Sequence, residues 1–549
     1  MIGFGSWRRQ GEHWIWLNAM AIALCVIMVF GLVFMIAFRG LAYFWPADLA
    51  QYVYLEHDRQ ELVVGEVSEE VVVSDPSGTQ EGFQDKEERK RIKLKVGNRD
   101  LYGSDFRWIW FDQIKETAYP ADLIAVEREE WGNFYGFFEG LTNSEGEIIA
   151  GGNYEDLLDL LPAIKDYRSG IARITHDEIN RINAKHERLR LERREAELKR
   201  KANASQLEDF AERKARLDRE YMEAEARLLS LESDFESLGG VILRAANGEK
   251  REIRLNQVYK VWKPNAMSLI AKIGAYISNI WGFLSENPRE ANTEGGVFPA
   301  IFGTVVMVFL MTVVTTPMGV VAAIYIREYA RQGVVIRLVR ICVNNLAGVP
   351  SIVYGVFGLG FFVYFIGGSI DQLFYPEALP APTFGSAGVL WASLTLAILT
   401  LPVVIVSAEE GFARIPGSVR EGSMALGATK FETIFKVLLP MSTPAIMTGM
   451  ILAIARAAGE VAPLMLVGVV KLAPDLVVDG TAPFIHLDRK FMHLGFHIYD
   501  VGFQSPNVDA STPLVYATAF LLLLVIIVLN ITAIMVRNRL RERYKQLDM

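Results

Sequence analysis

Six long apolar stretches constrain the fold of this 549-residue chain more than any other feature. They cover residues 17–38 and about 297–326, 338–366, 388–407, 441–470 and 513–536. An α-helix needs about 20 apolar residues to cross the hydrocarbon core of a bilayer, and each stretch reaches or exceeds that length. Several of them contain Gly and Pro, which spanning helices tolerate. The pattern predicts an α-helical polytopic membrane protein with six transmembrane helices.

Charged residues are concentrated between the first and second stretches, in residues 39–296. The net charge of −8 gives no sign of nucleic-acid binding. The two cysteines, Cys25 and Cys342, both lie in apolar stretches, which excludes a disulfide framework and a cysteine-based zinc site. The first stretch follows a basic start and precedes no A-x-A cleavage site, so we interpret it as an uncleaved span.

The positions of Lys and Arg predict the topology. On the side that holds both termini, basic residues occur at Arg8, Arg9, 327–340, 408–440 and 537–545. The loop 367–387 on the opposite side contains neither Lys nor Arg. The positive-inside rule therefore puts both termini in the cytoplasm. Residues 39–296 then lie outside, because long segments translocate with little regard to their charge.

Residues 39–296 combine two sequence patterns. Between 60 and 160, short alternating runs such as "ELVVGEVSEEVVV" and "RIKLKVG" predict β-strands. From about 176 to 238, apolar residues recur at heptad spacing with a break near 201–206, which predicts an antiparallel coiled-coil hairpin. Strand-like sequence returns after Gly240, so we expect a domain of α/β type that contains the hairpin. The hairpin can be a solvated spacer or a docking arm for a binding protein or a sensor.

The loop 409–440, between the fourth and fifth stretches, is polar but strongly patterned. It contains "REGSMALGATKFETIFKVLLP", in which Gly427 breaks a helical stretch over 418–426. A second helix is expected after Thr429, and Pro440 is expected to stop it. Two short helices that meet at a glycine form a compact projection on the cytoplasmic face. Such a projection can transmit force if another protein holds it.

The spacing of this loop resembles the EAA loop of permeases of ATP-binding-cassette (ABC) importers. The matching residues are Arg420, Glu421, Gly422, Ser423, Gly427, Leu439 and Pro440. In that family the EAA loop forms the coupling helix that seats in a cleft of the ATPase subunit, so the resemblance implies that these residues couple the chain to an ATPase. Gly422 and Ser423 replace two alanines of the family pattern, and both are small enough to keep close packing.

Two further segments resemble the A-type permease subunit of high-affinity phosphate importers: "NNLAGVPSIVYGVFGLG" (344–360) and "AIARAAGEVAPLM" (453–465). The resemblance covers roughly 297–540 and implies the type I ABC importer permease fold, with inorganic phosphate as the cargo. The implied partners are a second permease subunit of the C type, two ATPase subunits, a periplasmic phosphate-binding protein and membrane lipid. The implied location is the bacterial inner (plasma) membrane, which the chain would cross several times.

These inferences divide the chain into four parts. Residues 1–38 would form the cytoplasmic N-terminus and the first transmembrane helix, and 39–296 a periplasmic domain with the hairpin. Residues 297–540 would form the permease domain with the coupling loop, and 541–549 a cytoplasmic tail. The second part resembles an extra domain of some A-type subunits.

Two charged residues, Arg456 and Glu460, fall within the fifth apolar stretch. At an i, i+4 spacing they are predicted to share one helix face. They can form a self-neutralising structural pair. Alternatively, Arg456 lines a wet path in which its planar guanidinium contacts a tetrahedral oxyanion, and Glu460 orients it. The family resemblance favours the path, with Gly459 allowing close helix approach.

No catalytic chemistry is predicted on this chain. It lacks the P-loop motif G-x-x-x-x-G-K-[ST], so we expect no enzyme and no cofactor here, with ATP bound by partner subunits. The segment "HLDRKFMHLGFH" places His486, Asp488, His493 and His497 in an outside loop, where a surface amphipathic turn is favoured over a metal site. Two alternatives stay open: a permease for molybdate, sulfate or phosphonate, and a membrane-tethered sensor with a periplasmic input domain.

Overall fold

The computed structural model describes residues 12–56, 59–74, 88–149, 152–199, 203–505 and 508–545. Within them, six helical segments are long and apolar enough to cross a membrane, which confirms the predicted number. They are Trp14–Ala42, Phe298–Tyr329, Ser351–Phe374, Val389–Ala413, Lys430–Gly459 and Ser511–Arg539. The predicted cytoplasmic residues Arg8 and Arg9, and residues 546–549 of the tail, lie outside the described residues.

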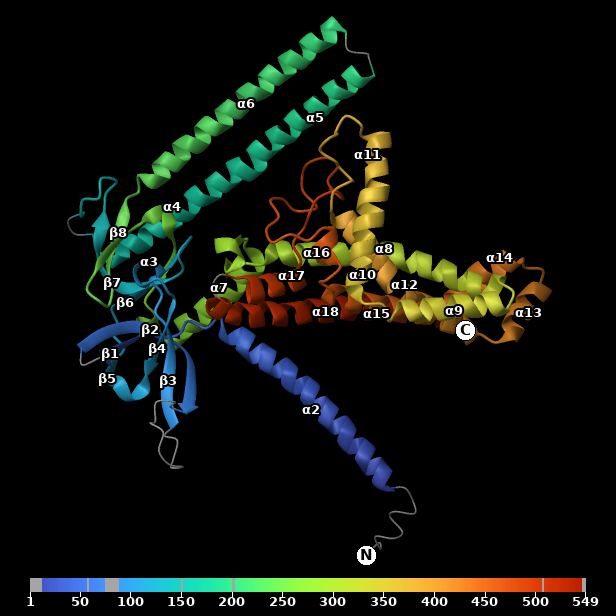
Figure 1. The fold of residues 1–549 in the computed structure, drawn as a ribbon, viewed down its shortest axis with the longest axis horizontal. Helices are drawn as coiled ribbons and strands as arrows, with labels where there is room; N and C mark the ends of the chain where they lie inside the picture. The colour runs from blue at the N-terminus through green and yellow to red at the C-terminus, as the bar shows by residue number, and fades with distance from the viewer. Residues whose placement is uncertain are drawn as a thin grey trace, which may run out of the picture.

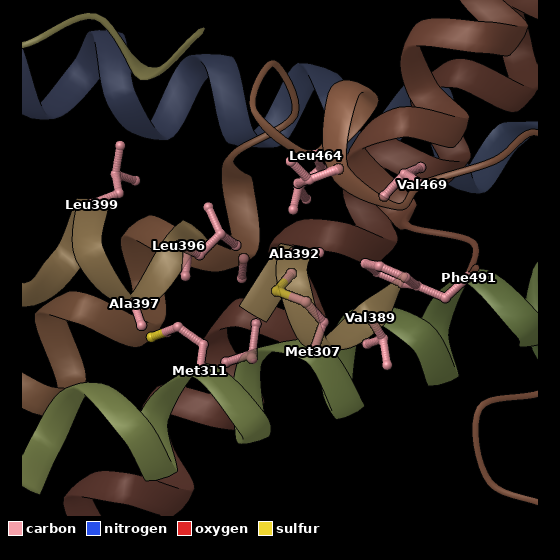
Figure 2. Close-up of a cluster of buried hydrophobic side chains, with 14 of the residues drawn as sticks. Met307, Met311, Val389, Ala392, Leu396, Ala397, Leu399, Leu464, Val469 and Phe491 are labelled. Atoms are coloured by element: carbon pink, nitrogen blue, oxygen red, sulfur yellow. The ribbon is translucent and has the colours of Figure 1, made fainter. Parts of the chain in front are cut away.

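Four of the spanning helices form a bundle that runs across Figure 1, and α2 (Glu12–Ala42) leaves its end at an angle. The four are α8 (Phe298–Ile324), α12 (Val389–Ala413), α15 (Leu439–Gly459) and α18 (Val508–Lys545). In Figure 2, Met307 and Met311 of α8 point toward Ala392 and Leu396 of α12, and all four side chains are buried. Methionine fills the irregular space beside small side chains because its unbranched chain adapts its shape.

The third span differs from the prediction of 338–366. The helical segments on either side of Pro350 are α9 (Val334–Leu346), then α10 (Ser351–Phe357), the π-helix η7 (Gly358–Gly367) and α11 (Gly368–Phe374). Proline lacks an N–H group and disfavours helical conformation in the residue before it. The continuous apolar run is therefore divided at Pro350, and the span begins only after it.

Residues 43–297, which we call the interspan domain, contain two five-stranded sheets. The first has the order β4-β3-β2-β1-β5, with β1 (Ala50–Glu56), β2 (Arg59–Ser74), β3 (Glu88–Lys95), β4 (Phe106–Trp110) and β5 (Ile114–Ala118). The second has the order β10-β6-β7-β8-β9, with β6 (Leu123–Arg128), β7 (Phe134–Thr142), β8 (Gly240–Arg244), β9 (Lys250–Arg254) and β10 (Val258–Trp262). All strand pairs in both sheets are antiparallel, so the domain is of the α+β type in the strict sense.

Two long helical arms form the hairpin, which Figure 1 shows extending away from the sheets. The first arm runs through α4 (Tyr154–Ala172), the π-helix η2 (Arg173–Ile179) and α5 (Asn180–Leu198), and the second is α6 (Ala204–Glu236). Four of the predicted heptad residues are buried between the arms: Ile182, Leu189, Leu217 and Ala224. The arms are antiparallel, because ion pairs join Glu178 to Arg227 at 2.6 Å and Glu192 to Arg213 at 2.8 Å.

The first arm begins about twenty residues earlier than the prediction of 176. Asn153 accepts hydrogen bonds from the backbone N–H groups of Glu155 and Asp156, and the Asp156 carboxylate accepts one from the Asn153 N–H. This reciprocal capping satisfies N–H groups that a helix start leaves unpaired, so the helix begins at Tyr154.

Shorter helices connect these parts. They are α3 (Arg99–Tyr102), α7 (Leu269–Ser285), η6 (Tyr325–Tyr329), α13 (Gly417–Ala425), α14 (Lys430–Glu432), η8 (Thr433–Leu438), α16 (Leu464–Val467), α17 (Leu494–Tyr499) and η9 (Asp500–Gln504). Two short strands, β11 (Pro288–Arg289) and β12 (Glu294–Gly295), pair with each other before α8 begins.

The hairpin contacts the loop between α16 and α17. Asn180 Nδ2 donates a hydrogen bond to Asp475 Oδ1 at 3.1 Å, and Arg188 Nη2 donates one to the carbonyl of Ala482 at 3.2 Å. The interspan domain therefore lies against the same loop that follows the Arg456–Glu460 segment.

Candidate anion site and coupling loop

Arg456 lies in the last turn of α15, and Glu460 lies just beyond its end. The backbone of Glu460 is extended, with φ −79° and ψ 135°. The prediction that both residues share the face of one continuous helix is therefore wrong. A helix that continued to Pro463 would lose the hydrogen bond to the Gly459 carbonyl, because proline has no N–H group, and the proline ring would clash with that carbonyl. The two side chains still meet, with 3.5 Å between Arg456 Nε and Glu460 Oε1.

The Arg456 guanidinium keeps most of its hydrogen-bonding capacity. It has five N–H donors, and Glu460 is its one ion-pair partner among the described residues. The Arg456 side chain is 32% exposed and the Glu460 side chain 20% exposed, so the pair is half-buried. A cation at a helix C-terminus is also favoured by the helix dipole. This arrangement can bind an anion, and the Glu460 carboxylate compensates the positive charge of Arg456 when no anion is bound. The role of the pair in transport stays a prediction.

Among the described residues, Gly459 does not bring two helices of this chain together. A Cβ atom built there meets no atom of this chain within 4 Å, so close approach of another helix at Gly459 stays a prediction. The close approach occurs at Gly355 of α10, where a Cβ atom would lie 2.7 Å from Pro463 Cα. Gly355 belongs to one of the segments that suggested the family, but only the tertiary packing shows which glycine touches the chain after Glu460.

The coupling loop forms two helical pieces that meet at Gly427, as predicted. Helix α13 ends at Ala425, and Gly427 has φ +90°, a conformation that favours glycine. Helix α14 then starts with a capping box in which the Glu432 N–H donates to Thr429 Oγ1 at 3.2 Å and the Thr429 N–H donates to Glu432 Oε2 at 3.1 Å.

Pro440 does not stop the second helix, which corrects the prediction. Helix α14 continues through the π-helix η8 into α15, so that Lys430–Gly459 forms one uninterrupted helical segment. The wider turns of η8 immediately precede Leu439 and Pro440, and a π-bulge changes which backbone groups pair. Proline is tolerated at the first positions of a helical segment because its missing N–H would be unpaired there anyway.

Arg420 is the best-connected residue of the loop. Its Nη2 donates to Glu328 Oε1 at 2.7 Å and to the carbonyl of Phe412 at 2.7 Å, while Nη1 donates to the carbonyl of Ile415 at 2.6 Å. The side chains of Arg420 and Glu328 are only 19% and 9% exposed. Glu328 lies in η6 at the end of the second span, and the sequence did not single it out. Its one signal is that it is an acidic residue directly after an apolar stretch.

The other predicted coupling residues differ in how exposed they are. Glu421 and Gly422 are exposed, and a Cβ atom at Gly422 would meet nothing within 4 Å. Ser423 Oγ and Thr433 Oγ1 lie 2.9 Å apart and tie α13 to η8. Leu439 and Pro440 lie half-buried at the start of α15.

The tip of the loop is apolar and exposed. Leu426 is 91% exposed, and Met424, Phe431 and Phe435 beside it are also exposed. A soluble surface rarely presents such a group of large apolar side chains unless a partner covers it. Ile434 and Leu438 of the same helical segment turn inward and are buried.

The histidines of the loop before α18 are not arranged as predicted. His493 and His497 are buried instead of lying on a surface turn, and His493 Nδ1 accepts a hydrogen bond from the Gly495 N–H at 3.1 Å. His486 contacts Asp479 at 3.0 Å. The described residues contain no group of three or more His, Cys, Asp or Glu side chains that could hold a metal ion.

A second ion pair lies at the loop end of α12. Arg340 Nε of α9 donates to Glu409 Oε1 at 2.6 Å, and Arg340 Nη2 is buried without a hydrogen-bond partner. The sequence analysis assigned no role to Arg340 or Glu409. The pairing of α9 with α12 comes from packing and has no local sequence signal.

The fold and the site together define a multi-pass helical membrane protein with a charged pair at one end of a long helix and a protruding loop at the other. The family described as binding-protein-dependent transport system inner membrane component matches residues 315–543. The chain is 32% identical over 271 residues to the phosphate transport system permease protein PstA 1 of Mycobacterium tuberculosis (strain CDC 1551 / Oshkosh), covering 49% of this chain and 77% of that protein. The chain therefore belongs to the family of binding-protein-dependent transport system inner membrane components, the permeases of ABC importers.

Other relatives match over shorter parts. The chain is 33% identical over 201 residues to the probable ABC transporter permease protein YqgH of Bacillus subtilis (strain 168), covering 36% of this chain and 60% of that protein. Among solved structures, the inward-facing MetNI methionine ABC transporter aligns over 48% of this chain and 97% of that chain, at 19% identity. Its TM-score of 0.32 is too low to carry an argument.

Proposed function

We propose that this chain is the A-type permease subunit of an ATP-driven importer for inorganic phosphate. The observation that carries the proposal is Arg456, an arginine at the end of α15 whose guanidinium has, among the described residues, a single acidic partner, at 3.5 Å. A guanidinium suits a tetrahedral oxyanion because it is planar, permanently charged and rich in N–H donors. The similarity to the phosphate permease PstA 1 supports phosphate as the cargo.

The helical segment Lys430–Gly459 offers a mechanical route between the two sites. It carries the coupling loop at its start and Arg456 near its end. From Pro440 to Arg456 the helix rises about 24 Å, at about 1.5 Å per residue. In the proposed mechanism, ATP hydrolysis in a partner subunit moves the loop, and the stiff helix carries that movement to the Arg456–Glu460 pair. The ion pair between Arg420 and Glu328 makes the second span move with the loop.

The proposal includes a topology and a set of partners. Both termini and the coupling loop lie in the cytoplasm, residues 39–296 lie in the periplasm, and the chain resides in the inner membrane. One of two ATPase subunits binds the apolar tip around Leu426, a C-type permease completes the path, and a periplasmic phosphate-binding protein delivers the anion. The membrane nature of the family and the exposed tip support this assembly.

Phosphate uptake by variants of Arg456 tests the proposal. Cells that lack this gene would be complemented with the wild type or with Arg456→Gln, and uptake of radiolabelled phosphate would be measured at equal membrane abundance. We expect Arg456→Gln to lose at least nine-tenths of the uptake. Lys490→Gln, which removes an exposed positive charge from the loop after α16, should retain it.

Competition with other oxyanions tests whether phosphate is the transported anion. Excess unlabelled molybdate, sulfate or phosphonate should leave phosphate uptake by the wild type unchanged. Full uptake by Arg456→Gln would make the Arg456–Glu460 pair structural. If the wild type restores uptake of another oxyanion instead, the cargo assignment is wrong.

A further inference from the structure

A cavity of about 710 Å³ lies inside the interspan domain, where the two sheets meet α4, α7 and the chain that leaves α2. Its volume is in the range of small-molecule binding sites, which are commonly about 300–1,000 Å³. Aromatic side chains form part of its wall, among them Tyr43, Trp45, Tyr259 and Trp262. Nothing in the transport proposal uses this cavity, and the inference below does not depend on that proposal.

The cavity is lined by charges of both signs in nearly equal number, five basic and four acidic. Some are already paired: Arg289 forms an ion pair with Glu127, and Glu66 accepts a hydrogen bond from the Tyr135 hydroxyl at 3.0 Å. Lys95 also lines the cavity, and its ammonium group has no ion-pair partner among the described residues.

Several buried polar atoms in this wall lack partners. Arg289 keeps only 10% of its side chain exposed, and its Nε and Nη1 atoms are buried without a hydrogen-bond partner. Its guanidinium carbon lies 3.5 Å from the centre of the Tyr259 ring. Glu294 Oε2 is likewise buried without a partner. Unpaired buried polar groups are costly, and a bound group that accepts hydrogen bonds from Arg289 and donates one to Glu294 would satisfy both side chains.

Helix α7, which lies beside the cavity, is amphipathic. Ser278 and Asn279 on one face of α7, and Glu286 directly after its end, line the cavity. The opposite face exposes large apolar side chains: Leu269, Ile270, Ile273, Ile277 and Trp281. A helix with this division lies in the interface of a bilayer with its apolar face among the acyl chains. The cavity is also lined by Tyr43–Trp45, the residues that directly follow the first spanning helix α2.

We propose that this cavity binds a phosphodiester joined to a primary ammonium group, the headgroup chemistry of phosphatidylethanolamine. Lys95 and Arg289 would hold the phosphodiester, and Glu286 and Glu294 would accept hydrogen bonds from the ammonium group. A simple anion fits less well, because four carboxyl groups line the same space. The source is either a membrane lipid, which reaches the cavity along α7, or a soluble phosphodiester such as glycerophosphoethanolamine.

Lipid retention by the full-length chain tests the proposal. The chain would be reconstituted with equal amounts of phosphatidylethanolamine, phosphatidylglycerol and phosphatidylcholine, extracted in mild detergent, and examined by native mass spectrometry. We expect phosphatidylethanolamine to be retained at least five-fold over the other two lipids. Phosphatidylglycerol lacks the ammonium group, and the ammonium group of phosphatidylcholine has no N–H donor.

Two variants and one control locate the site. Lys95→Gln should reduce the retained phosphatidylethanolamine about five-fold. Glu286→Gln should remove the preference over phosphatidylglycerol, and it keeps the test valid if Lys95→Gln does not fold. Lys115→Gln neutralises an exposed lysine of β5 outside the cavity and should change nothing.

Titration with glycerophosphoethanolamine distinguishes the two sources. Binding of the lipid alone identifies a lipid site, and binding of the soluble compound identifies a site for a soluble phosphodiester; either result supports the proposal. Equal retention of the three lipids without binding of the soluble compound, or an equal effect of Lys95→Gln and Lys115→Gln, would overturn it. Stronger binding of inorganic phosphate than of either compound would do the same.

Discussion

At the scale of single residues, the charged groups of this chain divide by how many partners they have. Among the described residues, Arg456 has one acidic partner, at 3.5 Å, and keeps N–H donors for an anion. Arg420 donates hydrogen bonds to a carboxylate and to two carbonyl groups. The arrangement of Arg456 suits reversible binding of a ligand, and that of Arg420 suits a permanent structural contact.

Loss of the ion pair between Arg420 and Glu328 should destabilise the protein and uncouple ATP hydrolysis from transport. Arg420→Ala would leave Glu328 buried without its cation, a change that costs about 3 kcal/mol in comparable buried pairs. We expect the melting temperature to fall by several degrees and phosphate uptake to drop at least ten-fold. Arg414→Ala is the matched control, because its ion pair with Glu410 is 79% and 64% exposed and such pairs contribute little. Equal effects of the two substitutions would contradict this role.

Glu294 should make stability depend on pH. Burial, reinforced by Glu127 and Glu290 and opposed by Lys95 and Arg289, raises the pKa of its carboxyl from 4.5 to about 7. The unfolded chain releases this proton near pH 4.5 and the folded chain near pH 7. The free energy of unfolding should therefore fall by about 3 kcal/mol as the pH rises through this window, and stay level above it.

Thermal unfolding of the full chain at pH 5 and pH 7.5 measures this effect. Glu294→Gln keeps a neutral amide at both pH values, so it should lose the part of the pH dependence that the wild type shows. An unchanged pH dependence in Glu294→Gln would assign the effect to other groups.

The sequence identified Arg456 and Glu460 from residue type and spacing, and Arg420 from the resemblance of its loop to the EAA loop, but not their surroundings. Glu328 lies 92 positions from Arg420, and no local pattern joins them. Gly459 was expected to touch a helix because it lies beside Glu460, whereas the close contact within this chain belongs to Gly355. Residue type can be read locally, but contact partners depend on which distant segments pack together.

At the scale of elements, the conformation of the coupling loop depends more on Gly427 than on Gly422. Gly427 has φ +90° and turns the chain between α13 and α14. Gly427→Val should cost about 1–2 kcal/mol through backbone strain and reduce ATP-driven uptake. Gly422→Ala should be neutral or slightly stabilising, because its Cβ atom meets nothing and alanine favours a helix by up to about 1 kcal/mol.

ATPase activity and uptake, measured together in reconstituted importer, check this pair of variants. Retained ATPase activity with reduced uptake in Gly427→Val would indicate lost coupling. A strong loss of uptake in Gly422→Ala would mean that Gly422 itself contacts the ATPase, contrary to our expectation.

Element boundaries were less predictable than the elements themselves. The number of spans follows from apolar length, and the strands follow from alternation. Helix α9 ends before Pro350, as is normal before a proline, whereas Pro440 lies within the helical segment Lys430–Gly459, directly after the π-helix η8. The two prolines differ because the conformation of the neighbouring backbone decides whether the N–H group that proline lacks would have been hydrogen-bonded. Residue type alone does not specify that conformation.

At the scale of the whole molecule, the interspan domain and the coupling loop lie at opposite ends of the bundle, as Figure 1 shows. The proposed topology puts the first in the periplasm and the second in the cytoplasm. It can be tested in a variant in which Cys25 and Cys342 are replaced by Ser. A membrane-impermeant maleimide should label Glu145→Cys, in an exposed turn of the interspan domain, in spheroplasts. It should label Leu426→Cys only after the membrane is opened, and the reverse pattern would invert the topology.

The sequence by itself determined the membrane character, the six spans, the strand-rich domain with its hairpin, and the loop that marks an importer permease. These features depend on apolar length, periodicity and turn-forming residues, which act between near neighbours. Only the tertiary structure decided that Arg456 and Glu460 lie at a helix end, that Arg420 binds Glu328, and that the hairpin rests on the loop after α16. Only it enclosed the charged cavity beside α7. Those contacts join segments far apart in the chain, and the free energy of packing them together, with their charges paired, selects one arrangement that no local pattern records.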